Sequence, residues 1–133
     1  MATAALPPGL MDTDVLIDTE RGLPDAVAFF GAQFALGSVQ MSAVSAMELI
    51  AGARNQAELK KVLNSISNAV VHELSAGMSR QARHWLAQYS LSHGLEFADA
   101  LIGATAFHLG LPLYTKNVKH FQMLPGLNVV RPY

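Results

Sequence analysis

Two patterns of apolar and polar positions follow one another along this chain: short runs of apolar residues, and longer segments in which apolar residues recur with helical spacing. The short runs favour β-strands, and the segments with apolar residues spaced three and four apart favour helices. Strands are predicted at 9–15, 38–42, 69–74, 111–116 and 128–132. Helices are predicted at 24–36, 42–53, 55–68, 79–93 and 96–109.

This regular alternation of strands and helices predicts the fold class. Strands separated by helices form a mainly parallel sheet that helices cover on both faces. The 133 residues suffice for one domain but not two. We therefore expect a single α/β domain over residues 9–133, preceded by a loose tail over residues 1–8, with Trp85 in the core.

The composition limits the function classes. A net charge of -1 means that any nucleic-acid site must be local. The chain has no cysteine, and we find neither a basic leader nor an apolar run long enough to span a membrane, so a soluble, cytoplasmic protein is expected. The mean hydropathy of +0.27 is high for a small domain, which favours a partner chain that covers apolar surface.

Four acidic residues stand at positions where acids are costly. Asp12 and Asp14 follow the first predicted strand in LMDTDVLID, and an extended chain would place both side chains on one side. Glu48 lies early in the helix after the second strand, and Asp99 lies near the start of an almost entirely apolar helix. The carboxyl ends of parallel strands meet at one edge of a sheet, so the four acids are expected to converge there.

Each acid also has a purely structural interpretation. Asp12 or Asp14 alone is compatible with a turn or cap residue. The segment SAME, Ser45 to Glu48, matches a capping box, in which the glutamate satisfies a backbone donor. Asp99 would be stabilised by the helix dipole. The combination is therefore more informative than any single acid.

Converging carboxylates favour a divalent cation. Two carboxylates about 4 Å apart repel each other by roughly 4 kcal/mol at an effective dielectric constant of 20. Oxygen ligands without cysteine or a histidine pair favour Mg²⁺ or Mn²⁺ over zinc, and such ions commonly act on phosphodiesters. Lys116, Lys119 and His120, in TKNVKHF, are candidates for contacts with a phosphate backbone.

The order and wording of these segments identify a family. LMDTDVLID, SAMELIAGA, FADALIGATAFHLGLPLYTKNVKHF and NVVRPY together resemble the PIN domains and, within them, the VapC toxins of type II toxin-antitoxin modules. The resemblance implies catalytic and metal-binding roles for Asp12, Glu48 and Asp99, with Glu48 able to act through a metal-bound water.

The same resemblance assigns supporting roles to Asp14, Thr115 and Asn117. Asn117 stands where some members carry a fourth aspartate, which questions a second metal site. The implied protein is a Mg²⁺- or Mn²⁺-dependent endoribonuclease that inhibits translation and growth. Its implied partners are RNA, a VapB-type antitoxin, a second toxin chain in a homodimer, and DNA only through the antitoxin, in a toxin-antitoxin hetero-oligomer.

Two alternatives remain open at the level of sequence. A haloacid dehalogenase-type phosphatase also begins with D-x-D, but its motif expects threonine or valine where Leu16 stands, and its later motifs are not found here. A non-catalytic module that keeps the fold and acts through its antitoxin or through RNA is the other alternative, because the fourth acid is missing. Metal-dependent turnover separates this module from a nuclease.

Overall fold

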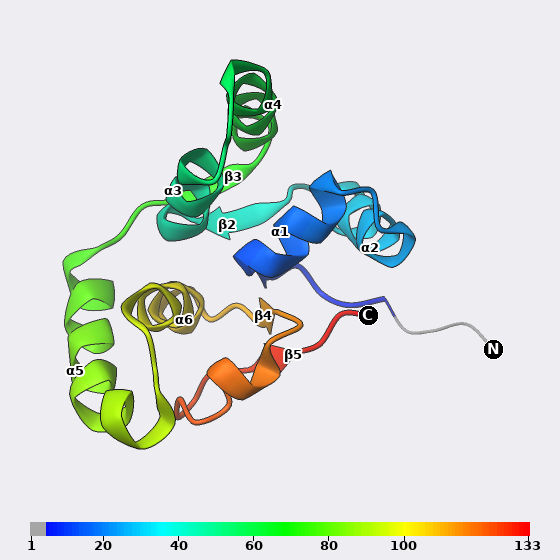
Figure 1. The fold of residues 1–133 in the computed structure, drawn as a ribbon. Coiled ribbons are helices and arrows are strands. Elements are labelled where there is room, and N and C mark those ends of the chain that lie inside the picture. The colour runs from blue at the N-terminus through cyan, green and yellow to red at the C-terminus, as the bar shows by residue number, and fades with distance from the viewer. Residues whose placement is uncertain (1–4) are drawn as a thin grey trace.

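The computed structural model describes residues 5–133, in which one sheet of five short strands is surrounded by helices (Figure 1). The strands are β1 (Leu10–Met11), β2 (Gln40–Ser42), β3 (Val70–His72), β4 (Leu113–Tyr114) and β5 (Val129–Val130). The helices are α1 (Thr13–Glu20), α2 (Pro24–Ala35), α3 (Ala43–Ala51), α4 (Gln56–Ser67), α5 (Ala76–His93), α6 (Phe97–Leu109) and the 3-10 helix η1 (Val118–His120).

The sheet has the order β3-β2-β1-β4-β5, and all four strand pairs are parallel. β1 is the central strand, and Leu10 is in register with both Gln40 and Leu113. The carboxyl ends of all five strands therefore lie at one edge of the sheet, where the chain leaves β1 for α1. The predicted parallel α/β fold is confirmed.

Helices cover both faces of the sheet, because successive strand residues point to opposite sides. Leu10 packs into a core cluster with Trp85 of α5 and Ile102 of α6. Met11, the next residue, packs into a second cluster that contains Phe29 of α2. The expected core position of Trp85 is confirmed, since 2% of the residue is exposed.

The predicted strand at 9–15 is wrong in its second half. The strand ends at Met11, Asp12 is the N-cap of α1, and its side chain accepts the Thr13 N–H. A short apolar run such as Val15-Leu16-Ile17 does not distinguish a strand from a buried helix by periodicity. Asp14 therefore lies in the first turn of α1, and not on a strand beside Asp12.

The capping-box interpretation of Ser45 and Glu48 is also wrong. Helix α3 begins earlier, and its N-cap is Ser42, whose hydroxyl accepts the Val44 N–H at 3.2 Å. Ser45 lies inside the helix, and Glu48 lies in its second turn. The carboxylate of Glu48 is therefore not used as a cap.

Residues 1–4, half of the predicted tail, lie outside the described residues. Residues 5–8 belong to no helix or strand, but their backbone bonds to the domain. The carbonyl of Pro7 accepts hydrogen bonds from the Tyr114 hydroxyl and from Gln33 Nε2. Among the helices of residues 5–133, none has both the length and the apolar character needed to cross a membrane.

Candidate active site

Asp12 occupies the central position at the carboxyl edge of the sheet. Its side chain is buried, and each oxygen accepts one hydrogen bond of 2.8 Å, Oδ1 from the Thr13 N–H and Oδ2 from the Thr115 hydroxyl. Burial, followed by the charge of Asp14, raises the pKa of Asp12 from 3.8 to about 7, and Asp99 adds to the rise. A carboxylate in this position is costly without a nearby cation.

Asp14 faces the residues that follow β4. Its Oδ2 accepts the backbone N–H of Lys116 at 2.9 Å, and the Thr115 hydroxyl lies 3.4 Å away. Because Thr115 has one hydroxyl proton, its shorter contact with Asp12 takes precedence. Within residues 5–133, Oδ1 of Asp14 has no hydrogen-bond partner although it is buried. A buried acceptor without a partner is available to a ligand.

Glu48 is held by Thr13, which is not among the site residues predicted from the sequence. Thr13, between the two aspartates of the DTD motif, is buried, and its hydroxyl donates to Oε1 of Glu48 at 2.7 Å. Ser45 Oγ lies 2.9 Å from the same hydroxyl oxygen. The position of Thr13 between two acids was the only signal in the sequence, and nothing there linked it to Glu48.

Asp99 lies in the first turn of α6, where 22% of its side chain is exposed. Burial raises the pKa of this carboxyl, and the charges of Glu96 and Glu48 act in the same direction. The neighbouring His120 opposes the rise, with Nδ1 at 3.4 Å from Oδ2 of Asp99. His120 thus borders Asp99 directly.

The other residues of the TKNVKHF segment differ in exposure. The ammonium of Lys116 is 2.5 Å from Oδ2 of Asp18, so an acid of the same chain already neutralises its charge. Asn117 is exposed, and its backbone N–H donates to the Thr115 hydroxyl oxygen at 3.0 Å. Lys119 and His120 are exposed. Of the three candidates for RNA contacts, these two are thus the more accessible.

The structure links the sequence-selected acids electrostatically. Asp12 is influenced by Asp14 and Asp99, and Asp99 is influenced by Glu48. As they stand in the described chain, no three His, Asp or Glu side chains form a group that could hold a metal ion. The chemistry of the donors nevertheless fits a hard divalent cation, because the costly Asp12 carboxylate and the unpartnered Asp14 oxygen would both gain from one.

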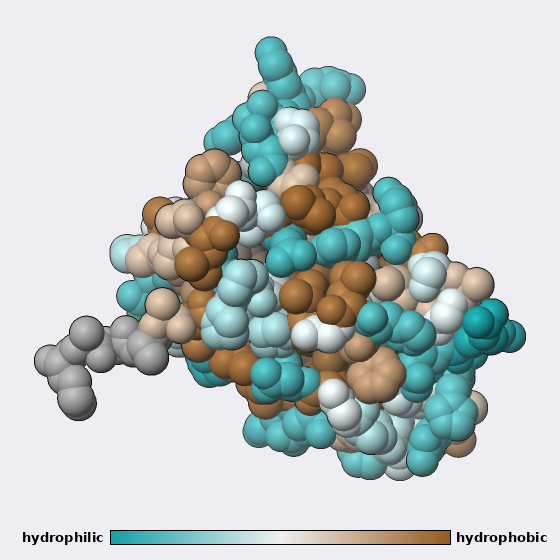
Figure 2. All heavy atoms as spheres, turned by 180° about the vertical axis from the view of Figure 1, so that it is seen from behind, coloured by the Kyte–Doolittle hydropathy of each residue, from teal (hydrophilic) through white to brown (hydrophobic). Residues whose placement is uncertain are grey.

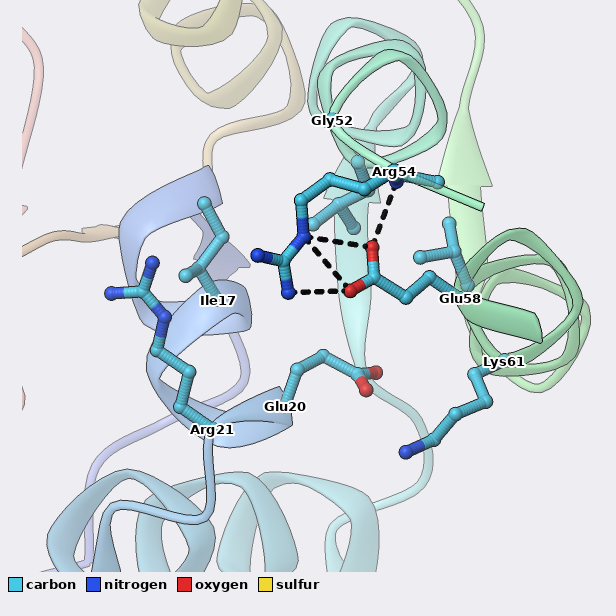
Figure 3. Close-up of a pocket in the computed structure, with 10 residues that line it drawn as sticks. Ile17, Glu20, Arg21, Gly52, Arg54, Glu58 and Lys61 are labelled. Carbon is cyan, nitrogen blue, oxygen red and sulfur yellow. Dashed lines mark hydrogen bonds and ion pairs between the residues drawn. The ribbon is translucent and has the colours of Figure 1, made fainter. Parts of the chain in front are cut away.

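The structure also contains a cavity of about 500 Å³, and none of the four acids lines it. It lies between the end of α1 and the α3–α4 segment, with Ile17 and Val62 on its apolar wall (Figure 3). Charged side chains surround it, and Arg54 Nη2 and Glu58 Oε1 pair across 2.7 Å. The cavity therefore lacks the acid cluster required for metal-assisted chemistry.

Comparison with known proteins agrees with this arrangement. The family model described as "PIN domain" matches residues 10–124. The chain belongs to the PIN-domain family. This membership excludes the haloacid dehalogenase alternative, and the resemblance to PIN domains drawn from the sequence is confirmed.

Individual PIN-domain relatives are similar over almost the whole chain. Ribonuclease VapC19 from Mycobacterium tuberculosis (strain ATCC 25618 / H37Rv) is 35% identical over 121 residues, which cover 89% of this chain and 95% of the relative. Ribonuclease VapC10 from the same strain is 35% identical over 119 residues, covering 89% of each chain. The VapC part of the resemblance is thereby confirmed as well.

A solved structure shows the same PIN fold. A chain of a toxin-antitoxin complex from Klebsiella pneumoniae superimposes with a TM-score of 0.76 and 28% sequence identity, over 94% of this chain and 98% of that chain. The superposition therefore spans nearly the whole domain.

Proposed function

We propose that this PIN domain is a metal-dependent endoribonuclease that acts as the toxin of a VapBC-type toxin-antitoxin module. The observation that carries the proposal is Asp12, buried at the end of the central strand with a pKa near 7 because of burial and of the neighbouring Asp14 and Asp99 carboxylates. The similarity to two proteins named as VapC ribonucleases supports the reaction class.

Asp12 and Asp99 are the proposed metal ligands, and Glu48 is proposed to bind through a metal-bound water. Carboxylates at this edge are suited to Mg²⁺ or Mn²⁺. When bound, such an ion lowers the pKa of a water molecule and neutralises charge that develops on a phosphodiester. Its binding would also make the ionised form of Asp12 favourable.

Two threonines hold these acids in place. The Thr115 hydroxyl fixes Oδ2 of Asp12, and the Thr13 hydroxyl fixes Oε1 of Glu48. Hydrogen bonds of this kind leave further lone pairs of the carboxylates free for a cation. The Lys116 N–H orients Asp14 in the same way. We propose that Asp14 and Thr115 support the site and that Asp12 binds the ion.

RNA is the proposed substrate, and its contacts are local. The net charge of -1 provides no general attraction for a polyanion. Lys119 and His120 are both exposed, and His120 lies beside Asp99, so these two residues are the proposed backbone contacts. Exposed Asn117, on the same segment, is proposed to orient water through its amide oxygen.

A VapB-type antitoxin and a second copy of the chain are the proposed protein partners, with DNA bound only through the antitoxin. Several large apolar side chains are exposed, among them Phe34 (57%), Met47 (59%) and Phe97 (71%). Figure 2 shows that apolar side chains on one face form patches separated by hydrophilic ones. Exposed apolar area of this kind favours association.

Cleavage of a mixed RNA pool tests the catalytic proposal. The purified, antitoxin-free chain is incubated with Mg²⁺ or Mn²⁺ beside an EDTA control, the Asp99→Asn variant and an Asp25→Asn variant. Asp25 is an exposed acid in the first turn of α2 and is the matched control. We expect metal-dependent cleavage by the wild type and Asp25→Asn, and none by Asp99→Asn.

Two results contradict the proposal. Full activity of folded Asp99→Asn would remove Asp99 from the site. No cleavage by the folded, metal-replete wild type would favour the non-catalytic module instead. Light scattering tests the homodimer separately, and a monomer at high protein concentration would contradict it.

A further inference from the structure

The side chains of Lys116, Asp18 and Tyr133 form one hydrogen-bonded network. The Lys116 ammonium donates to Oδ2 of Asp18 at 2.5 Å, and the Tyr133 hydroxyl donates to the same oxygen at 2.9 Å. Asp18 lies in α1, one turn after Asp14, and 11% of its side chain is exposed. The network joins α1, the chain after β4 and the chain after β5.

The negative charge of Asp18 attracts both donors of the network. A buried carboxylate is costly without partners, and here the ammonium and the phenol both point at it. The hydrogen bond from Lys116 is the main reason that the pKa of Asp18 is lowered, although burial opposes this. A long lysine side chain, otherwise flexible, is thereby held in one position.

Residues 131–133 hold the backbone of Lys116 from a second direction. Arg131 Nη1 donates to the Lys116 carbonyl at 3.4 Å, and Arg131 Nε donates to the Tyr133 carbonyl at 3.1 Å. The centroids of the Tyr133 and Phe29 rings are 6.3 Å apart. The Lys116 ammonium lies 5.8 Å from the centroid of the Tyr133 ring. Tyr133 is therefore fixed by packing as well as by its hydroxyl.

The loop of residues 115–117, which these contacts hold in place, orients two acids. Thr115 donates to Oδ2 of Asp12, and the Lys116 N–H donates to Oδ2 of Asp14. A displacement of the 115–117 loop would move both donors together. Outer partners of this kind commonly tune the ligands of a metal site.

We propose that Asp18 and Tyr133 are positioning residues, which hold Lys116 and so fix the 115–117 loop that aligns Asp12 and Asp14. The inference rests on the proposed nuclease function and assigns Lys116 to alignment of the acids instead of contact with RNA. Neither Asp18 nor Tyr133 touches the reacting groups, so both act through the loop.

The Tyr133→Phe variant is the sharpest test, because it removes the hydroxyl and keeps the ring against Phe29. Tyr89→Phe makes the same change on α5, where Tyr89 packs against the core and the described residues give its hydroxyl no hydrogen bond. Lys116→Met removes the ammonium. All variants are full-length chains, and their thermal unfolding is recorded first.

Three measurements follow: amide hydrogen exchange of Lys116 by NMR, Mn²⁺ affinity by electron paramagnetic resonance, and kcat and KM for RNA cleavage. In Tyr133→Phe and Lys116→Met we expect exchange at Lys116, the Mn²⁺ Kd and 1/kcat each to rise about tenfold, with KM unchanged. Tyr89→Phe should match the wild type. The Tyr133→Phe/Lys116→Met double variant should lose no more than either single variant, since both act through one network.

The alternative role of Lys116 gives a different result. A phosphate contact would raise KM and reduce the salt dependence of binding in Lys116→Met, while Tyr133→Phe would equal the wild type in all three measurements. That result would overturn the proposal. Faster exchange over the whole domain, and not only in the loop, would also overturn it, because it would mean a general loss of stability.

Failure of the nuclease proposal is distinguishable from failure of this one. If the wild type cuts no RNA, the proposed function fails, and amide exchange and Mn²⁺ affinity still decide whether the network positions the acids. If the wild type cuts RNA and Tyr133→Phe equals it throughout, only the positioning role fails.

Discussion

The Thr115 hydroxyl donates a 2.8 Å hydrogen bond to Oδ2 of Asp12, across 103 residues of sequence. Both residues are buried, and they follow neighbouring parallel strands, β1 and β4. The bond therefore depends on the pairing of these strands, which places the two strand ends side by side. It favours the ionised form of a carboxylate whose pKa burial raises.

Thr115→Val should reduce RNA cleavage about tenfold and destabilise the fold by about 1–3 kcal/mol, because Oδ2 of Asp12 and the Asn117 N–H both lose a buried partner. Single-turnover cleavage and urea unfolding measure the two effects. Thr115→Ser keeps the hydroxyl and is the control. Equal losses in the serine and valine variants would contradict the prediction, because the hydroxyl that serine retains would then not preserve activity or stability.

Thr13→Val should reduce cleavage about tenfold, because it releases the Glu48 carboxylate from its only described hydroxyl donor. Thr19→Val is the matched control on the same helix, since the Thr19 hydroxyl bonds to the Val15 carbonyl at 2.9 Å and to no acid. The Mg²⁺ concentration for half-maximal cleavage should rise in Thr13→Val alone. If both variants behave alike, Thr13 does not act through Glu48.

The pH dependence of the free energy of unfolding should show the raised pKa of Asp12. Its pKa is raised on folding from 3.8 to about 7, so the folded state holds the proton more tightly than the unfolded state. In metal-free protein this group therefore destabilises the fold progressively as the pH rises from about 4 to about 7. The full effect is about 4 kcal/mol.

Urea unfolding in EDTA at pH 5 and pH 8 measures this effect. Between these pH values the wild type should lose about 2–3 kcal/mol more than Asp12→Asn, which retains an oxygen for the Thr13 N–H but has no charge. Added Mg²⁺ should restore part of the loss in the wild type at pH 8. Identical pH profiles in the two proteins would falsify the raised pKa.

Gly9→Ala should destabilise the fold by about 1–3 kcal/mol. A Cβ at this position would lie 2.8 Å from the Pro112 carbonyl oxygen and closer still to the Tyr114 ring, next to the central strand. Gly31→Ala is the control, because nothing lies within 4 Å of a Cβ there in the middle of α2. It should stabilise by about 0.5–1 kcal/mol. The free energies of urea unfolding compare the two variants, and a neutral Gly9→Ala would contradict the tight packing.

The sequence by itself determined the class of fold and the main acids. Alternating apolar runs predicted five strands in a parallel sheet, and costly acids in apolar surroundings selected Asp12 and Asp99. Both inferences rest on local properties, periodicity and the free energy of burying charge, which are visible in a stretch of ten residues. The strand predicted at 9–15 was wrong in its second half because local periodicity does not distinguish a buried strand from a buried helix in the short apolar run Val15-Leu16-Ile17.

Only the tertiary structure decided which groups serve those acids. Thr13 reaches Glu48 across 35 residues, and Tyr133 reaches Asp18 across 115. Hydrogen bonds of this kind depend on positions within a few tenths of an ångström, which strand register and helix packing set together. A single sequence does not give such distances. The roles of Thr13, Asp18 and Tyr133 could therefore be identified only from the tertiary structure, in which the strand ends form one edge.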